Sequence, residues 1–157
     1  MLRLRKILAA VDFSPCSEVA AKYAVDLAER VGASVTLVHG YEFPVQMPFP
    51  GAPPFLPSPD TMVEVAEGVT RQLEELASRI RRPEVAVSIA RVEGPPKQMI
   101  PAFADRHDFD LIVVGTHGRT GLRHVLLGSV AEAVVRRAHR PVLTVHEPSE
   151  QTAQAAP

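Results

Sequence analysis

Short, continuous runs of apolar residues alternate along this chain with longer segments in which apolar residues recur every three or four positions. The first pattern is typical of strands buried on both faces, and the second predicts amphipathic helices. The runs predict strands at Lys6–Val11, Ser34–Val38, Glu84–Val92, Leu111–Val114 and Val142–Val145. Helices are predicted between them, starting near Ser14, Ser58, Gly94 and Ser129. Because strand and helix alternate, the pattern predicts parallel strands joined by right-handed crossovers, and therefore a three-layer α/β sandwich.

Capping and breaking residues mark the predicted helix ends. Ser14 or Ser17 caps the first helix, Pro15 suits its first turn and Gly32 suits its end. Pro101 lies inside the third predicted helix, which therefore either begins late, so that Pro101 falls in its first turn, or kinks. Two further serines are predicted N-caps, for the second and the last helix: Ser58 and Ser129.

Helical spacing also assigns a buried face to each predicted helix. In the first helix the buried face comprises Ala20, Tyr23, Ala24, Leu27 and Val31. In the second it comprises Met62, Val65, Val69, Leu73, Leu76 and Ile80. In the third it comprises Ile100, Phe103 and Ala104, and in the last Val130, Val134, Val135 and Ala138.

The segment after the fourth strand has the features of an anion-binding loop. It contains Gly115, Gly118 and Gly121, and Gly128 directly precedes the helix that starts at Ser129. Glycine lets the backbone approach a ligand closely, so that amide N–H groups point at phosphate oxygens. The start of a helix adds unpaired N–H groups and the positive end of its dipole. The alternative is a glycine-rich turn without a ligand.

The spacing Gly115-x2-Gly118-x9-Gly128-Ser129, which follows an apolar strand and precedes a helix, resembles the universal stress protein family in its ATP-binding branch. The similarity extends from Arg5 to about His146, and Asp12-Phe13-Ser14 matches the family's ending of the first strand. The resemblance implies the adenine nucleotide alpha hydrolase-like fold of universal stress proteins, a five-stranded parallel sheet with strand order 3-2-1-4-5. In that order the first and fourth strands are neighbours, so Asp12 and the loop at Gly115 converge.

The resemblance also implies a nucleotide site, with the phosphates on the glycine loop, the ribose and Mg²⁺ near Asp12, and adenine against Val38–Gly40. From local sequence alone, Asp12 could equally cap the following helix. Arg119 can donate to phosphate or face solvent, and we expect His39 to be structural rather than catalytic. The predicted cofactor-binding residues are Val11, Asp12, Val38, His39, Gly40, Gly115, Thr116, His117, Gly118, Arg119, Gly128, Ser129 and Val130. Asp12 is also the predicted Mg²⁺ ligand, directly or through water.

Composition narrows the class of protein. The chain has 157 residues, of which 46% are hydrophobic and 22% charged, as in globular domains. The net charge of −1 gives no bulk electrostatic case for nucleic acid or an anionic membrane as partner. The single cysteine, Cys16, excludes an internal disulfide, and we expect it to be a small buried residue. The sequence has no secretory signal pattern and no apolar run of membrane-spanning length, so we expect a cytoplasmic protein.

Two segments lie outside the strand–helix pattern. Residues 1–147 are predicted to form one domain, with a proline-rich insertion at 43–59 that either binds a partner, covers the nucleotide or packs on the protein's own surface. Residues 148–157 are small and polar, and we expect a disordered tail.

The functional expectation is an ATP-binding, Mg²⁺-dependent regulatory protein of the stress response. The chain offers no convincing set of nucleophile, base and orienting group, so efficient catalysis is not predicted. The alternatives are an interaction module without nucleotide, or a slow ATPase or autophosphorylating enzyme. Family members commonly dimerise through the last strand, and the apolar edge at Val142–Val145 would need covering, so a homodimer is expected.

Overall fold

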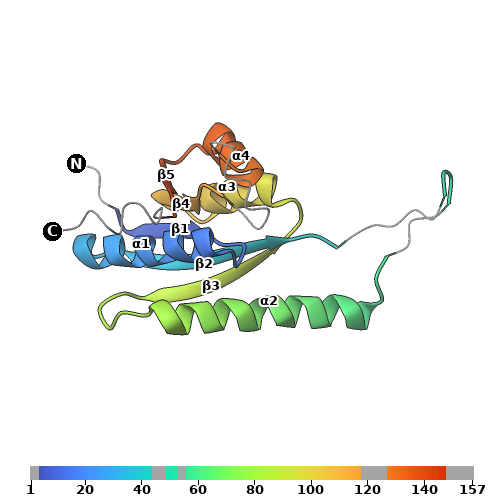
Figure 1. Ribbon diagram of the computed structural model, residues 1–157, viewed down its shortest axis with the longest axis horizontal. Helices are drawn as coiled ribbons and strands as arrows, with labels where there is room; N and C mark the ends of the chain where they lie inside the picture. The colour runs from blue at the N-terminus through green and yellow to red at the C-terminus, as the bar shows by residue number, and fades with distance from the viewer. Residues whose placement is uncertain (1–3, 44–48, 53–55, 118–126, 148–157) are drawn as a thin grey trace.

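The computed structural model describes residues 4–43, 49–52, 56–117 and 127–147, in which strands and helices alternate (Figure 1). The strands are β1 (Lys6–Ala10), β2 (Ser34–Tyr41), β3 (Val87–Glu93), β4 (Leu111–Gly115) and β5 (Val142–Val145). The helices are α1 (Pro15–Val31), α2 (Pro59–Ile80), α3 (Pro96–Arg106) and α4 (Ser129–Arg137). Among the described residues, no helix combines the length and the hydropathy that a membrane crossing requires.

All strand pairs of the sheet are parallel, and the strand order is β3-β2-β1-β4-β5. This confirms the five-stranded sheet and the order implied by the family resemblance. The chain moves from β1 outward to β2 and β3, then returns to the other side of β1 with β4. The order therefore reverses between β1 and β4, and ligands of open α/β sheets bind beside the carboxyl ends of strands at such a point.

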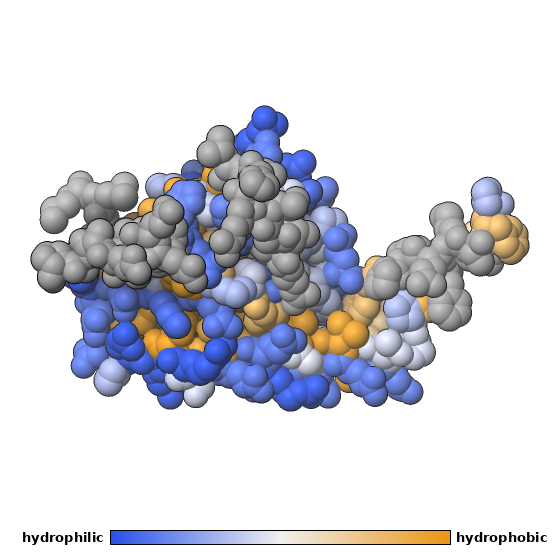
Figure 2. Space-filling model, in the orientation of Figure 1, coloured by the Kyte–Doolittle hydropathy of each residue, from blue (hydrophilic) through white to orange (hydrophobic). Residues whose placement is uncertain are grey.

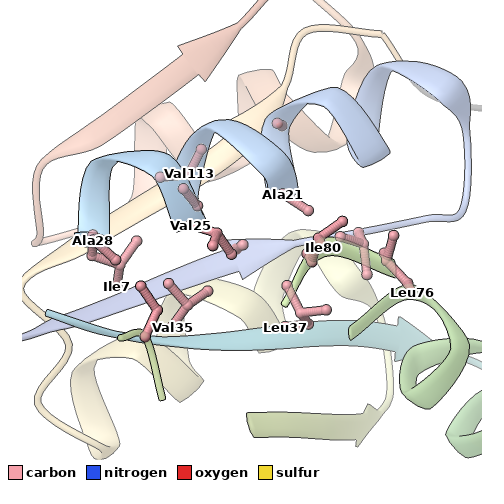
Figure 3. Packing of buried hydrophobic residues seen from close by; sticks show 14 of the residues in the cluster. Ile7, Ala21, Val25, Ala28, Val35, Leu37, Leu76, Ile80 and Val113 are labelled. Carbon is pink, nitrogen blue, oxygen red and sulfur yellow. The ribbon is translucent and has the colours of Figure 1, made fainter. Parts of the chain in front are cut away.

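Alternate residues of the central strands face opposite layers of helices, as the period of two requires. Ile7 and Ala9 of β1 pack in one core with α1 and α2, whereas Leu8 and Ala10 pack in a second core with α3 and α4. Figure 1 shows α1 and α2 on one side and α3 with α4 on the other. Figure 3 shows the first core, in which Ile7, Val35, Leu37 and Val113 of the strands meet Ala21, Val25 and Ala28 of α1 and Leu76 and Ile80 of α2.

The predicted capping residues are confirmed for the first two helices. Ser14 is the N-cap of α1, with its hydroxyl accepting from the backbone N–H of Ser17 at 3.2 Å, and Pro15 is the first helical residue. Gly32 ends α1 with the left-handed φ of 70° that favours glycine. Ser58 caps α2 by accepting from the N–H of Thr61.

The prediction for the start of α4 was wrong by one residue. Gly128 is the N-cap and Ser129 is the first helical residue, so the hydroxyl of Ser129 does not cap the helix. Val135, predicted to be buried, is 46% exposed, and Ala131 is buried in its place. At about 100° per residue Val135 lies about 100° around the helix from the buried Val134, and so turns away from the sheet.

The predicted buried face of α1 was only partly right. Ala20 and Ala24 are buried, but Tyr23 and Val31 are 52% and 44% exposed. The buried face consists of small residues instead: Cys16, Ser17, Ala20, Ala21, Ala24, Val25 and Ala28. The helix therefore packs close to the sheet through its alanines, and its larger apolar residues lie to one side.

The first half of α2 also departs from the prediction. Leu73 and Leu76 are fully buried, but Val65, predicted to be in the core, is 40% exposed. The 22 residues of α2 span about 33 Å, whereas the seven of β3 span about 23 Å, so the first turns of α2 extend past its neighbouring strand. Figure 2 shows hydrophobic residues at the surface in the region of α1 and α2.

The remaining differences concern boundaries. Pro101 lies in the second turn of α3, because the helix begins at Pro96 rather than later. Strand β1 stops one residue before the predicted end, β2 continues to Tyr41, and β3 begins at Val87. Part of the 43–59 insertion and the whole 148–157 tail lie outside the described residues; within the insertion, Phe43 contacts Tyr41 edge-on and Phe49 is 65% exposed.

Candidate functional site

A cavity of about 220 Å³ lies at the carboxyl ends of the central strands, where the strand order reverses. Interiors of folded domains leave few voids larger than a water molecule, so a space of this size is a candidate ligand site. Its walls come from the ends of β1, β2 and β4 and from the starts of α1, α3 and α4. The lining residues are Ala10, Val11, Asp12, Ser17, His39, Gly40, Pro96, Ile100, Val114, Gly115, His117, Gly128, Ser129, Val130 and Ala131.

Asp12 lines the cavity and also organises the turn into α1. Its Oδ1 accepts from the backbone N–H of Ser14 at 3.0 Å and from the Ser14 hydroxyl. The Asp12 backbone N–H donates to Ser17 Oγ at 3.2 Å, and the Ser17 hydroxyl donates to the carbonyl of Ser14 at 3.0 Å. The N-cap of α1 is thus Ser14 and not Asp12, whose hydrogen bonds support the turn before the helix and hold the carboxylate at the cavity wall.

Phe13 holds the next part of the wall. Its φ is 63°, a left-handed conformation that costs a bulky residue about 1–3 kcal/mol and persists only where surrounding contacts impose it. The ring packs on the imidazole of His39, with 4.6 Å between ring centroids. His39 Nδ1 lies 2.7 Å from the carbonyl oxygen of Val11, and because a carbonyl can only accept, Nδ1 carries the proton. Phe13 and Val11 thus fix the orientation of His39, which agrees with a structural role for this histidine.

Gly40 allows α3 to approach the end of β2. A Cβ at this position would lie 3.0 Å from Pro96 Cβ and 3.1 Å from Pro96 Cα, closer than side chains normally pack. Pro96 and Ile100 therefore reach the cavity and give it an apolar wall beside β2.

Gly115 plays the equivalent part between β4 and α1. A Cβ there would lie 3.0 Å from the carbonyl carbon and oxygen of Cys16 and 3.1 Å from its Sγ. Cys16 itself is buried, as predicted, and its thiol donates to the carbonyl of Val145 at 3.6 Å. Glycine at the end of β4 thus lets the first turn of α1, with Asp12 before it, lie directly against the end of that strand.

The start of α4 completes the site. The Gly128 N–H donates to the carbonyl of Thr116 at 2.6 Å, which holds the helix start against the end of β4. No side chain caps the first turn of α4 within the described residues. Ser129 and Val130 line the cavity at this end, where the first N–H groups of a helix lack intrahelical partners. The arrangement therefore offers backbone donors and a helix dipole to an anion.

Most of the predicted site residues converge on this cavity. Val11, Asp12, His39, Gly40, Gly115, His117, Gly128, Ser129 and Val130 all line it. Val38 and Thr116 do not; both are fully buried just behind the wall. Gly118 and Arg119 lie outside the described residues. Six lining residues were not predicted: Ala10, Ser17, Pro96, Ile100, Val114 and Ala131.

The charges at the cavity are few. Asp12 is the only acidic residue among the described lining residues, and none of them is a lysine or arginine. The described part of the chain contains no group of three or more histidine, cysteine, aspartate or glutamate side chains suited to holding a metal ion. A cation at this site would thus have one carboxylate from the described lining residues.

Comparison with known proteins places this geometry in context. The model of the universal stress protein family matches residues 3–146. Universal stress protein MJ0531 of Methanocaldococcus jannaschii is 34% identical over 151 residues, which cover 94% of this chain and 85% of that protein. Universal stress protein Rv2005c of Mycobacterium tuberculosis is 32% identical, and the match covers 90% of this chain and 45% of that longer protein.

Solved structures with the same fold include the M. jannaschii protein MJ0577, with a TM-score of 0.76 at 24% identity, covering 94% of this chain and 99% of that one. A universal stress protein solved in complex with cAMP has a TM-score of 0.60 and 25% identity, covering 90% and 96% of the two chains. The Archaeoglobus fulgidus universal stress protein in complex with dAMP has a TM-score of 0.61 and 26% identity, covering 92% and 99%.

Proposed function

This chain belongs to the universal stress protein family, and we propose that it binds ATP with Mg²⁺ in the cavity as a cytoplasmic, nucleotide-dependent regulatory protein of the stress response. The observation that carries the proposal is the cavity itself. It joins the uncapped start of α4, an apolar wall from α3 and the carboxylate of Asp12 at the point where the strand order reverses. The helix start offers donors to phosphates, the apolar wall offers a surface to a base, and the carboxylate offers an acceptor to a ribose hydroxyl or a ligand to a metal ion.

Each part of the nucleotide has a matching wall. The phosphates would lie at Gly115 and at Gly128–Val130, where backbone N–H groups act as donors. A hydrogen bond to a charged group contributes about 1.5–3 kcal/mol, so a few such amides suffice without a lysine. Adenine would lie on the apolar side formed by Gly40 and Pro96, with the ribose near Asp12.

Two solved relatives support an adenine nucleotide as the ligand. One relative is in complex with cAMP and the other with dAMP, and both have the same fold as this chain. Each of those nucleotides carries one phosphate, so the second and third phosphates of ATP are what we add for this chain, on the strength of the glycine spacing from Gly115 to Ser129.

Asp12 is the reason for including Mg²⁺. A carboxylate close to a polyphosphate repels it, and at an effective dielectric constant of about 20 two unit charges 4 Å apart interact by about 4 kcal/mol. A divalent cation between the two turns this repulsion into attraction, and Mg²⁺ is usually held by one or two carboxylates together with substrate phosphates.

Regulation, rather than turnover, fits the groups that the cavity offers. Asp12 Oδ1 is hydrogen-bonded to Ser14, and His39 Nδ1 is bonded to a backbone carbonyl. We therefore propose binding and regulation as the function, with any hydrolysis of ATP slow.

Calorimetric titration of ATP into the purified protein, in excess Mg²⁺ and separately in EDTA, tests this function. The parent is expected to bind one nucleotide per chain at least about tenfold more tightly with Mg²⁺. Asp12→Asn keeps an oxygen for the Ser14 hydrogen bonds but removes the charge, so it should lose the Mg²⁺ effect and keep binding in EDTA. Asp26→Asn, on the exposed side of α1, is the matched control and should behave as the parent. No binding at millimolar nucleotide would contradict the proposal and favour an interaction module without nucleotide.

A homodimer through β5 is the proposed assembly. The other edge strand, β3, carries Arg91 and Glu93, charges of the kind that prevent pairing with a second sheet. Strand β5 has the sequence VLTV without a charge, and its first three residues are only half-buried. Sedimentation equilibrium should give a dimer for the parent and a monomer for Thr144→Lys; a monomeric parent at high concentration would contradict the proposal.

A further inference from the structure

Thr116 occupies a junction between the cavity, the start of α4 and the end of β5. Its backbone N–H donates to the carbonyl of Val145 at 2.9 Å, and its carbonyl accepts from the N–H of Gly128. Its side chain is fully buried. The hydroxyl oxygen lies 3.0 Å from Nδ1 of His117 and 3.1 Å from Nδ1 of His146. One buried hydroxyl therefore contacts two imidazoles, one at the cavity wall and the other on the exposed residue that follows β5.

The hydroxyl has a single proton, so it can donate to only one of the two neutral imidazoles. Donating to one Nδ1 and accepting from the other is its favoured arrangement, because the only other acceptor given for it among the described residues is the weakly accepting Cys16 Sγ at 4.0 Å. The ring that accepts from Thr116 has its own proton on Nε2, and the ring that donates to Thr116 has its proton on Nδ1. His117 and His146 are thus held in opposite tautomers, although their ring centroids are 6.5 Å apart.

We propose that Thr116 is a positioning residue that couples the tautomer of His117 at the cavity to the tautomer of His146 at the end of β5. In one state Thr116 donates to His117, which presents Nε2–H on its other side, and His146 is protonated on Nδ1. In the second state both rings and the hydroxyl are reversed. To interconvert the two states the hydroxyl rotates and each imidazole exchanges a proton with solvent, releasing one from one ring nitrogen and taking one up at the other, without backbone movement.

The coupling has a direction, which rests on the proposed function. A phosphate is an acceptor, so an anionic ligand beside His117 favours the state with a proton on His117 Nε2. The same state leaves His146 with its proton on Nδ1 and a lone pair on Nε2. Ligand binding in the cavity therefore changes which hydrogen-bonding group the edge of the sheet presents to a second molecule, and by linkage a donor that binds His146 strengthens ligand binding.

The other groups that face the hydroxyl are compatible with this coupling. Among the described elements packed around it, the only further titratable side chain in contact is Cys16 of α1, whose Sγ lies 4.0 Å from Thr116 Oγ1. The thiol donates to the carbonyl of Val145, so its sulfur can only receive a proton from the hydroxyl. That position is used only when both rings donate to the hydroxyl, whose proton must then turn elsewhere.

Imidazole ¹⁵N–¹H correlation spectra of the ligand-free protein test the coupling without any nucleotide. At about pH 8, above the ordinary histidine pKa of about 6.5, the parent should show one of the two rings protonated on Nδ1 and the other on Nε2. His146→Gln identifies the His146 signals. Thr116→Val, similar in shape but without the hydroxyl, should abolish the opposite pairing, and Thr116→Ser should restore it. The same tautomer on both rings of the parent would overturn the proposal.

Adding Mg-ATP tests the direction. In the bound parent His117 should carry its proton on Nε2 and His146 on Nδ1, whichever state dominates beforehand. Thr116→Val should bind ATP about five- to tenfold more weakly, with Thr116→Ser close to the parent. A bound state with His146 protonated on Nε2 would overturn the coupling. Absence of any ATP binding by calorimetry would instead defeat the proposed function and the direction, while the ligand-free spectra would still decide the coupling.

Discussion

The contact between Gly115 and the first turn of α1 can be tested by adding one methyl group. Gly115→Ala builds a Cβ 3.0 Å from the carbonyl carbon and oxygen of Cys16 and 3.1 Å from its Sγ. Gly115 has no positive φ, so alanine introduces no backbone strain and the cost is entirely steric. Two of the three close atoms are backbone and cannot move away by changing rotamer. Strand β4 and helix α1 must therefore separate by a few tenths of an ångström.

The expected magnitude follows from two opposing effects. Overpacking a well-packed site costs about 1–3 kcal/mol, while replacing glycine restricts the unfolded chain and returns about 0.4–1 kcal/mol. The net loss in the free energy of unfolding is therefore about 1–2 kcal/mol. For a chain of this length 1 kcal/mol corresponds to about 2–4 °C, so Tm should fall by about 2–8 °C.

Urea denaturation followed by circular dichroism measures this loss directly. Gly68→Ala in α2 is the matched control: the nearest atom to its new Cβ is a guanidinium nitrogen of Arg71 at 3.8 Å, so helix propensity alone should stabilise it by about 1 kcal/mol. Cys16→Ala added to Gly115→Ala should recover only part of the loss, since the backbone contacts remain. If Gly115→Ala is as stable as the parent while Gly68→Ala is more stable, the result would contradict the close approach of α1 to β4.

Three further perturbations separate core, electrostatic and site contributions. Leu73→Ala empties a fully buried position and should lower the free energy of unfolding by about 2–5 kcal/mol. The control Val63→Ala, at a 55% exposed position, should change it by less than about 0.5 kcal/mol. Equal effects of the two variants in urea denaturation would contradict the assigned core. The hydrogen bond from the backbone N–H of Arg5 lowers the pKa of Asp110 below its ordinary 3.8. The ionised Asp110 therefore stabilises the folded protein fully above that value, and this contribution disappears as the pH falls through the lowered native pKa. Asp110→Asn should therefore be less stable than the parent at neutral pH, and the two should converge in acid; a difference independent of pH would argue against the charge. Gly40→Val would place a Cβ 3.0 Å from Pro96 Cβ at the start of α3. This variant should bind nucleotide at least about tenfold more weakly in calorimetry, with an unchanged circular dichroism spectrum. An unaltered affinity would exclude the wall formed by Gly40 and Pro96 from the site.

The alternation of strands and helices was readable from the sequence because each element has a strong period of its own. The strand order was not in that pattern and came from the family resemblance. The face of α1 was misjudged because Tyr23 and Val31 are larger and more conspicuous than the alanines that pack on the sheet. Which of two neighbouring stripes is buried depends on how closely the helix approaches, and that distance is set by Gly115 and Cys16, far apart in the sequence.

The candidate site was predictable where a local motif carries it. Asp12 follows a strand, and Gly115 and Gly128 belong to a recognisable spacing, so both segments were found and both line the cavity. Pro96 and Ile100 have no motif and reach the cavity only because Gly40 admits α3. Ser17 carries only a weak signal in the sequence, because it is a polar residue on the helix face that the small apolar residues of α1 share.

The junction at Thr116 required the register of the sheet. Gly115 pairs with Val145 across β4 and β5, so the residues that follow the two strands, Thr116 and His146, become neighbours although they are 30 positions apart. Sequence patterning predicts both strands but not their register. The contact between Thr116 and His146 could therefore not be predicted from the sequence.

The central claim is that an adenine nucleotide binds at the carboxyl ends of β1 and β4, and the most direct test is to follow the backbone amide signals of the protein during titration with Mg-ATP. The account predicts saturable shifts that are largest at Asp12, Gly115 and the first turn of α4 from Ser129, with the amides of α2 unchanged. Shifts centred on α2 and β3, or no shifts at millimolar nucleotide, would contradict it.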